Sequence, residues 1–315
     1  MASKKINKNE KIFIAGHLGM VGSAITRRLE KRGYNNLLTR TRKELDLLNQ
    51  KAVFSFLNKE KPSYIFLAAA KVGGIHANDT FRAQFIYENL ALETNIIHGA
   101  YLAGVQRLSF LGSTCIYPRN CPQPMKEEYL LTGTLEPTNE PYAISKIAGI
   151  KMCESYNRQY ATQYVSSMPT NLFGINDNYD LNNSHVLPAL INKAHEAKLR
   201  GEKQLVVWGS GMPMREFLYV DDAADALIFM MENNVNEGIF NIGTGEEISI
   251  RKLAETIMNI IGFKGEIIFD ANKPDGTPRK LVSVERLKHL GWQATTKLED
   301  GIEKAYQDFL KHKEK

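Results

Sequence analysis

The stretch IFIAGHLGMVGSAITRRL, residues 12–29, decides the fold. A short apolar run precedes Gly16, Gly19 and Gly22, and a helical pattern follows them. Glycine permits a tight turn and lets backbone N–H groups approach a pyrophosphate at the N-terminus of a helix. Close packing of a helix on a strand would also explain the glycines. Their place directly after an N-terminal strand favours a dinucleotide site.

The rest of the chain extends this first unit. Short β-branched runs alternate with longer helical patterns, which predicts an α/β fold with a doubly wound parallel Rossmann sheet. We expect a dinucleotide-binding domain over residues 1–170, with a returning segment near 216–243. Residues 171–315 should form mainly a smaller C-terminal α/β lobe that binds substrate.

Composition restricts the partners. The net charge is +5, but many of the lysines lie in the opening MASKKINKNEK and the closing KHKEK. Such runs are usually solvated tails, so we expect no nucleic acid partner. Scattered Arg and Lys equally suit a small molecule that carries phosphate.

The cysteines indicate a reducing compartment. Cys115, Cys121 and Cys153 are an odd count without zinc spacing, which argues against a disulfide framework and against a metal site. The first apolar run is interrupted by His17 and by glycines, so it predicts neither a signal peptide nor a membrane span. The expected location is the cytoplasm, with no membrane contact.

The second predicted strand ends in TRTRKELDL, residues 39–47. A carboxylate at this place would bind the ribose 2′-hydroxyl of NAD. Arg40 and Arg42 stand there instead, and a guanidinium suits the 2′-phosphate of NADP. A solvated charge cluster is the alternative. Asp46 lies where a contact with adenine is expected.

The stretch EPYAISKIAG, residues 140–149, places Tyr142 and Lys146 on one face of a predicted helix. Free tyrosine titrates near pH ~10, and a nearby ammonium favours the phenolate. Tyr142 could then give a proton to a carbonyl oxygen while hydride reaches the carbon. Ser113, at the end of the predicted strand in RLSFLGS, could bind the same oxygen.

Several motifs together resemble the GDP-L-fucose synthase family of extended short-chain dehydrogenase/reductases, and GxxGxxG spacing is typical of that superfamily. The resemblance covers nearly the whole chain. Its motifs are AAAKVGGI (68–75), GSTCIYP (112–118), the segment 134–160, MPTNLFG (168–174), NSHVLPAL (183–190), WGSGMPMREFLYVDD (208–222) and PDGTPRK (274–280).

Members of this family are bifunctional GDP-4-keto-6-deoxy-D-mannose 3,5-epimerase/4-reductases that use NADPH. The resemblance implies a homodimer joined through helices at 81–103 and 141–160. It implies cofactor contacts from Gly16, His17, Gly19, Met20, Val21, Gly22, Arg40, Arg42, Asp46, Leu47, Ala68, Ala69, Ala70, Lys146, Pro169, Asn171, Leu172 and His185. For substrate binding we expect Lys193, Trp208, Arg215, Asp275 and Lys280.

The resemblance also assigns Cys115 and His185 to epimerisation. Related 4,6-dehydratases carry an acidic pair after the Ser-Thr step, whereas Cys115 stands here. A ketone at C4 acidifies C3 and C5, and each inversion needs a base on one face and an acid on the other. Free Cys and His titrate near ~8.5 and ~6.5. We take Cys115 as the base and His185 as the acid, with the direction at each centre left open.

Two departures and two alternatives stand beside this interpretation. Bacterial members carry an arginine where this chain has Leu18, which leaves the preference for NADP over NAD to Arg40 and Arg42. Lys193 replaces a common arginine, keeping the charge without the bidentate fork. An NAD-retaining nucleotide-sugar 4-epimerase would show no net use of NADPH. A non-catalytic dinucleotide sensor would generally lack the catalytic tyrosine.

Overall fold

The computed structural model describes residues 6–181, 184–273 and 275–313. Residues 183 and 274, each part of a motif named above, lie outside these ranges. Within them, the largest sheet has six parallel strands in the order β2-β1-β3-β4-β5-β10. Its strands are β1 (Ile12–Ala15), β2 (Leu37–Leu38), β3 (Tyr64–Leu67), β4 (Arg107–Leu111), β5 (Gln163–Pro169) and β10 (Ile239–Ile242).

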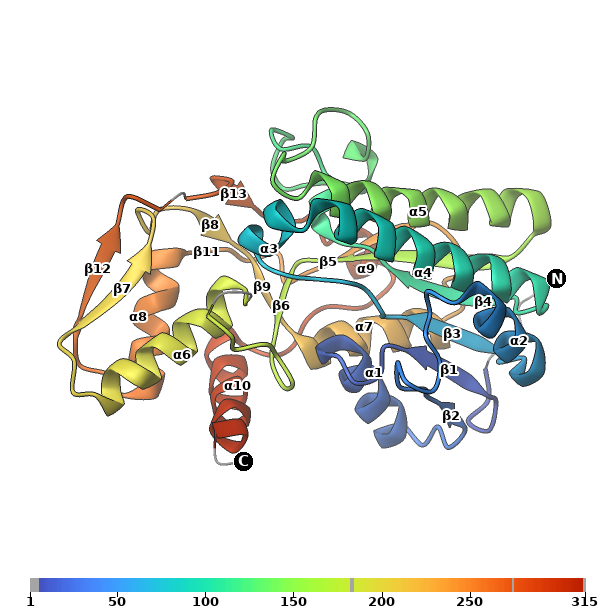
Figure 1. Ribbon diagram of the computed structural model, residues 1–315, viewed down its shortest axis with the longest axis horizontal. Coiled ribbons are helices and arrows are strands. Elements are labelled where there is room, and N and C mark those ends of the chain that lie inside the picture. Colours follow the sequence, from blue (N-terminus) through green and yellow to red (C-terminus); the bar gives the residue numbers. More distant parts are fainter. Residues whose placement is uncertain (1–5, 182–183, 274, 314–315) are drawn as a thin grey trace.

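Both faces of this sheet are buried. In β1, Ile12 and Ile14 join one apolar cluster, whereas Phe13 and Ala15 join another, as the alternation of side chains along a strand requires. One face is covered by α2 (Gln50–Glu60), α4 (Arg82–Leu102) and α5 (Glu140–Tyr160), and the other by α1 (Met20–Lys31) and α7 (Val220–Glu232). Figure 1 shows α4 and α5 side by side above the sheet. The doubly wound parallel sheet is confirmed.

The strand order reverses at β1, because β2 is added on one side of β1 and β3 is added on the other. In sheets of this kind, ligands bind outside the carboxyl ends of the strands at such a switch point. Gly16 follows β1 and Ala68 follows β3, so the predicted cofactor residues meet there.

Ion pairs fix the helix that follows the glycines. Arg27 of α1 pairs with Asp221 of α7, and Arg28 pairs with Asp225. Arg32 pairs with Asp225 and with Glu232. These contacts hold the C-terminal half of α1 against α7, a helix from the second half of the chain.

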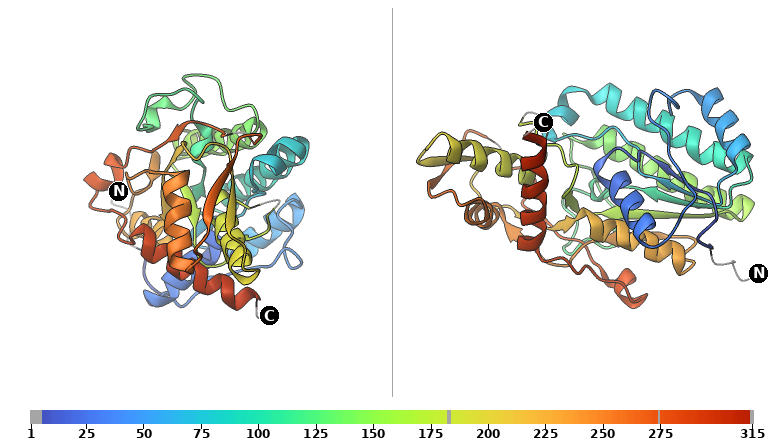
Figure 2. Two further views of the ribbon diagram at one scale, coloured as in Figure 1. Left: turned by 90° about the vertical axis from the view of Figure 1, so that its left-hand side faces the viewer. Right: turned by 90° about the horizontal axis from the view of Figure 1, so that it is seen from below.

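A third apolar cluster lies away from the sheet. Figures 1 and 2 show its elements at one end of the molecule. They are α6 (Val186–Leu199), α8 (Ile250–Ile261), α10 (Leu298–Lys313), β7 (Gln204–Trp208) and β12 (Glu266–Asp270), the two strands being paired in parallel.

Short elements connect this end to the sheet. β6 pairs with β9, while β11 and β13 both pair with β8. Their bounds are β6 (Asn171–Phe173), β8 (Met214–Arg215), β9 (Phe217–Tyr219), β11 (Ile248–Ser249) and β13 (Arg279–Lys280). The remaining helices are α3 (Ile75–Thr80), α9 (Glu285–His289), η1 (Thr114–Ile116) and η2 (Glu127–Tyr129).

One predicted strand is divided in the structure. The run YVSSMPTNLFG suggests a single strand, but β5 ends at Pro169 and β6 begins at Asn171. The N–H of Thr170 still bonds the carbonyl of Ile242 in the large sheet. From Asn171 onward the chain pairs with Phe217 in β9, and so it leaves the sheet toward the third cluster.

Candidate active site

The glycine turn is packed too tightly for any larger residue at two of its positions. A Cβ on Gly22 would lie 2.1 Å from the carbonyl oxygen of Gly16, and a Cβ on Gly16 would lie 2.7 Å from the backbone nitrogen of Ala69. Gly16 also has φ +90°, which favours glycine. The turn after β1 and the turn after β3 are therefore in direct backbone contact.

The N-terminus of α1 can receive an anion. Gly19 is its N-cap, and no side chain caps the helix. The first-turn N–H groups of a helix lack partners inside the helix, and phosphate is a natural ligand for them. His17, Met20 and Val21 line this turn in partly exposed positions, as a contact with a cofactor requires.

The arginines after β2 are available at the surface. The Arg42 side chain is 75% exposed, and its Nε lies 4.0 Å from Asp46, too weak a pair to hold either group. Arg40 lies over the Phe56 ring and donates to the carbonyl of Thr39. Leu47 packs against the core, and its carbonyl accepts from Asn95. Two guanidinium groups thus lie after β2, where the sequence analysis predicts a contact with a 2′-phosphate.

The turn after β3 is held by a side chain of α4. Asn89 is fully buried; its Oδ1 accepts from the N–H of Lys71, and its Nδ2 donates to the Lys71 carbonyl. The preceding residues, Ala68 to Ala70, are thereby kept against the glycine turn. The uncapped first turn of α1 and the guanidinium groups of Arg40 and Arg42 suit a ligand that carries phosphates, as NADP does.

The predicted catalytic hydroxyls meet at the end of β4. Ser113 caps η1, and its Oγ accepts from the N–H of Cys115 at 3.3 Å. Tyr142, in the first turn of α5, lies close enough to Ser113 for that hydroxyl to act on the phenol. Burial is the main factor that raises the pKa of Tyr142, and Cys115 and Glu93 raise it further, while Ser113 lowers it. The phenol is therefore protonated at neutral pH, contrary to the expectation that Lys146 brings its pKa toward neutrality.

Lys146 is buried beneath that phenol, with 1% of its surface exposed. Its Nζ lies 3.0 Å from Oε1 of Glu93 and 2.9 Å from the carbonyl oxygen of Leu111, which accepts a hydrogen bond from it. The ammonium is 5.8 Å from the centre of the Tyr142 ring. The sequence analysis did not single out Glu93. A charged residue within the mostly apolar run LALETNII was the available signal.

The thiol of Cys115 faces polar neighbours. Nδ2 of Asn139 donates to its Sγ at 3.3 Å, and Nζ of Lys280 lies 4.0 Å from the same sulfur. Asn139, the N-cap residue of α5, was also missed by the sequence analysis. A small hollow opens beside the thiol and is lined in part by Thr114, Gln123, Arg279 and Lys280. An ammonium at this distance offers a counter-charge to a thiolate.

His185 is the N-cap of α6 and does not cap the helix with its side chain. The residue is exposed to solvent. Surrounding protein atoms and the charge of Lys280 lower the pKa of His185. Cys115 and His185, both within the described part of the chain, form no hydrogen bond with each other. Lys280 lies near the sulfur of Cys115, and its charge lowers the pKa of His185.

The predicted substrate residues lie at the lobe end of the site. Lys193 and Lys273 stand over the Trp208 ring at 5.0 and 5.1 Å, and Trp208 is 53% exposed. Burial lowers the pKa of Lys193 and that of Arg215. Arg215 lies on β8, where its register partner on β13 is Lys280.

Two predicted ligand groups are already engaged by the protein. The carboxylate of Asp275 accepts from the N–H and from the hydroxyl of Ser210. The Asn171 amide donates to the Glu216 carbonyl. Pro169 ends β5 and Leu172 lies in β6, so both border the carboxyl end of the sheet.

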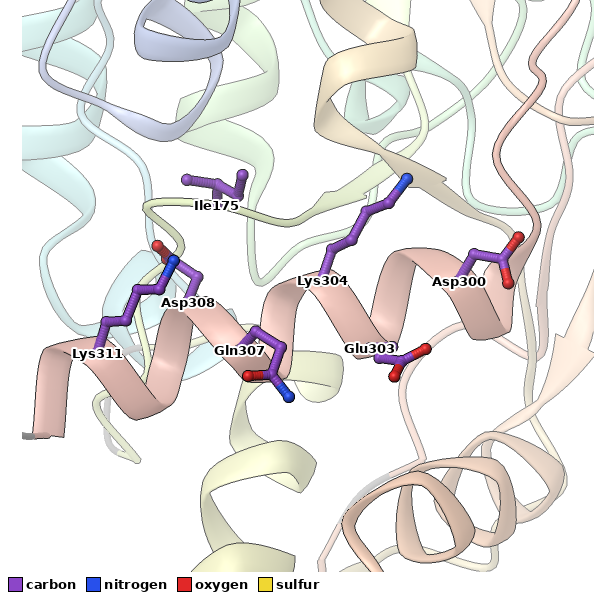
Figure 3. Close-up of a pocket in the computed structure, with 7 residues that line it drawn as sticks. All are labelled: Ile175, Asp300, Glu303, Lys304, Gln307, Asp308 and Lys311. Atoms are coloured by element: carbon purple, nitrogen blue, oxygen red, sulfur yellow. The ribbon is translucent and has the colours of Figure 1, made fainter.

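A more open pocket lies elsewhere. It runs along α10 beside Ile175, and Figure 3 shows Asp300, Glu303, Lys304, Gln307, Asp308 and Lys311 around it. None of the predicted catalytic, cofactor or substrate residues lines this pocket. Across the described ranges, there is no cluster of potential metal ligands and no helix long and apolar enough to cross a membrane.

Comparison with known proteins identifies the family. The sequence model of the NAD dependent epimerase/dehydratase family matches residues 12–243 of this chain. The chain is 55% identical over 315 residues to the GDP-L-fucose synthase of Escherichia coli (strain K12), covering 97% of this chain and 98% of that protein. The chain belongs to the GDP-L-fucose synthase family, within the epimerase/dehydratase family.

Solved structures agree with this membership. A GDP-L-fucose synthetase from Naegleria fowleri bound to NADP has a TM-score of 0.91 and 30% identity, covering 99% of this chain and 97% of that one. MlghC, a GDP-mannoheptose C4 reductase from Campylobacter jejuni with NADP bound, has a TM-score of 0.88 and 40% identity, with coverage of 97% and 99%. The GDP-L-fucose synthase family and GDP-sugar reductases thus share this fold.

Proposed function

We propose that this protein converts GDP-4-keto-6-deoxy-D-mannose to GDP-L-fucose with NADPH, by 3,5-epimerisation followed by reduction at C4. One observation carries the proposal: a thiol and a phenol flank the same serine. Cys115 bonds Ser113 through its N–H, and both residues act on Tyr142. A single carbonyl oxygen at Ser113 would therefore stand within reach of acid–base groups for both reactions.

Epimerisation is the first part. Ser113 and Tyr142 donate hydrogen bonds to the C4 carbonyl oxygen and so stabilise the enolate that forms on proton loss at C3 or C5. Cys115 removes the proton, and His185 returns one to the opposite face. Lys280 offers the thiolate a counter-charge and disfavours imidazolium, so we expect the acid role of His185 to weaken as pH rises.

Reduction is the second part. NADPH, when bound in the glycine turn, supplies the hydride for C4. Tyr142 gives its proton to the oxygen, and its high pKa keeps the donor protonated until then. Lys146, buried below the ring, stabilises the phenolate that remains before solvent restores the proton.

The lobe would hold the nucleotide end of the substrate. We assign residues 1–170 and the returning segment near 216–243 to the dinucleotide domain, and the remainder mainly to the substrate lobe. Arg215 and Lys193 supply positive charge for the diphosphate, and Trp208 supplies an aromatic face for the base.

A reductase without epimerase activity is the second candidate, favoured by the likeness to the C4 reductase MlghC. The experiment that separates the two uses GDP-4-keto-6-deoxymannose in deuterated water. NADPH loss is followed by absorbance, and the product is identified by NMR. Deuterium at C3 and C5 with GDP-L-fucose as product supports the proposal. An unepimerised alcohol without deuterium supports the second candidate, and no NADPH use rejects both.

We also propose a homodimer joined through α4 and α5, in the cytoplasm. Large apolar side chains on these helices face solvent in the single chain: Tyr87 and Leu102 on α4, and Ile144 and Tyr160 on α5. The three cysteines are free, as a reducing compartment requires. Sedimentation velocity should give twice the chain mass, and Leu102→Glu should shift it to the monomer. A wild-type monomer at micromolar concentration contradicts the dimer.

A further inference from the structure

The buried carboxylate of Glu93 has one partner. Its Oε1 lies 3.0 Å from Nζ of Lys146, and both side chains are at most 2% exposed. Apart from that ion pair, neither oxygen of Glu93 has a hydrogen-bond partner within the described ranges. A buried carboxylate normally collects several donors. Because Glu93 has only Lys146, the position of each charge depends on the other.

This pair lies directly behind the reacting phenol. Glu93 comes from the middle of α4 and Lys146 from the second turn of α5, and these helices pack side by side (Figure 1). The ammonium also donates to the carbonyl of Leu111 and faces the Phe110 ring at 4.9 Å. Lys146 therefore has a fixed position between a carboxylate, a carbonyl and two aromatic rings.

We propose that Glu93 is a positioning residue of the reductase site: it fixes the Lys146 ammonium against the Leu111 carbonyl and so limits how much of that positive charge acts on Tyr142. An ammonium alone beside a phenol would favour the phenolate, which cannot donate a proton. A paired ammonium leaves the phenol intact and remains close enough to stabilise the charge that develops on its oxygen. This inference rests on the proposed reduction step.

Other charged groups around the phenol must be considered. Cys115 on η1 acts on Tyr142 in the same direction as Glu93, and Lys280 on β13 faces Cys115. Cys153 on α5 lies near enough to Glu93 to interact with it, but burial raises the pKa of that thiol and keeps it neutral. Burial also raises the pKa of Glu93, and Lys146 opposes the rise. Lys146 is thus the opposite charge that favours the ionised form of Glu93.

Glu93→Gln tests the proposal, because it keeps the shape and an acceptor oxygen while removing the charge. We expect kcat for NADPH oxidation to fall at least tenfold with KM for the GDP-sugar unchanged. The alkaline limb of the kcat profile, where Tyr142 loses its proton, should move down by about 1 pH unit or more. The Lys146 ammonium would then act unpaired on the phenol, and an opposite charge within about 4–6 Å lowers the pKa of an acid by roughly that amount. Deuterium exchange at C3 and C5, measured without NADPH, should be retained.

Glu88→Gln is the matched control. Glu88 lies on the same helix and pairs with Lys71 at a partly exposed position, so its loss should leave the pH profile unchanged. Glu93→Asp keeps the charge on a shorter side chain; it should lower kcat while the alkaline limb moves less than in Glu93→Gln. If Glu93→Gln does not fold, Glu93→Asp decides alone.

The outcomes separate the two proposals. A wild-type protein that neither exchanges C3 and C5 nor oxidises NADPH would contradict the proposed function. A wild type that does both, with a Glu93→Gln variant of unchanged kcat and unchanged alkaline limb, would overturn the role of Glu93. A variant that loses thermal stability but keeps the wild-type pH profile would show a structural role only, and would also overturn the proposal. An unchanged Glu93→Asp variant does the same where Glu93→Gln does not fold.

Discussion

Gly22→Ala should disable the cofactor site without removing any contact of the wild-type protein. The added Cβ would lie 2.1 Å from the Gly16 carbonyl oxygen and 2.6 Å from its carbonyl carbon. An ordinary van der Waals contact begins near 3.4 Å, so the two backbones must separate by more than 1 Å. Overpacking of this kind costs about 1–3 kcal/mol of folding stability. The atoms that clash are backbone, so no side chain can move aside.

The same displacement should weaken NADPH binding. A misplacement of about 1 Å can cost roughly 100-fold in catalytic rate, which corresponds to about 2.7 kcal/mol, and we take the same free energy for the binding of NADPH. We expect Kd for NADPH, measured by fluorescence titration, to rise by about that factor. Gly19→Ala is the control, since its Cβ would meet only the Gly16 oxygen at 3.5 Å and its φ is −75°. It should keep the wild-type thermal midpoint. A Gly22→Ala protein with wild-type Kd and midpoint would refute the packing argument.

Three further predictions follow, two on the acid–base groups of the site and one on the pH dependence of stability. Tyr142→Phe removes the proton donor and should slow NADPH oxidation by about 10²–10⁴-fold; an unaffected rate contradicts the assignment. Cys115→Ser should slow deuterium exchange at C3 and C5 while reduction of the unepimerised ketone continues; full GDP-L-fucose formation argues against the thiol. Burial raises the pKa of Asp177 from its ordinary 3.8 to about 7, so between these values the folded state holds a proton that the unfolded state has lost, and stability falls as pH rises through this window. Urea unfolding of Asp177→Asn should show a flatter pH dependence; an equal slope would exclude Asp177 as the source.

Local patterns predicted the elements around the glycine turn well. The alternation in β1, the glycine spacing and the helical period of α1 all arise within a few residues, and the structure has the helix Met20–Lys31 directly after the glycine turn, where the pattern predicts a helix. The helix that carries Tyr142 and Lys146 was predicted equally well, because residues four positions apart lie on the same face of a helix. The epimerisation roles of Cys115 and His185 were predicted from the family resemblance and not from a local pattern.

Long-range partners could not be predicted in this way. Lys280 reaches the Cys115 sulfur across 165 residues of sequence, and no periodicity connects them. Glu93 pairs with Lys146 only because α4 and α5 pack together. Asp275 is the opposite case: its residue type suited a substrate contact, but the turn at Ser210 already uses its carboxylate. The division between β5 and β6 likewise depends on the later strand β9.

The two-residue pairing of β8 with β13 connects the two ends of the proposed substrate site. Arg215, the proposed diphosphate contact, and Lys280, which lies beside the thiol, are register partners. We therefore expect a phosphate that binds Arg215 to influence the position of Lys280 through the pairing of these two strands. A keto-sugar without its nucleotide has no diphosphate to bind Arg215. We therefore expect inversion of this sugar at C3 and C5 to be slow even when the sugar is saturating.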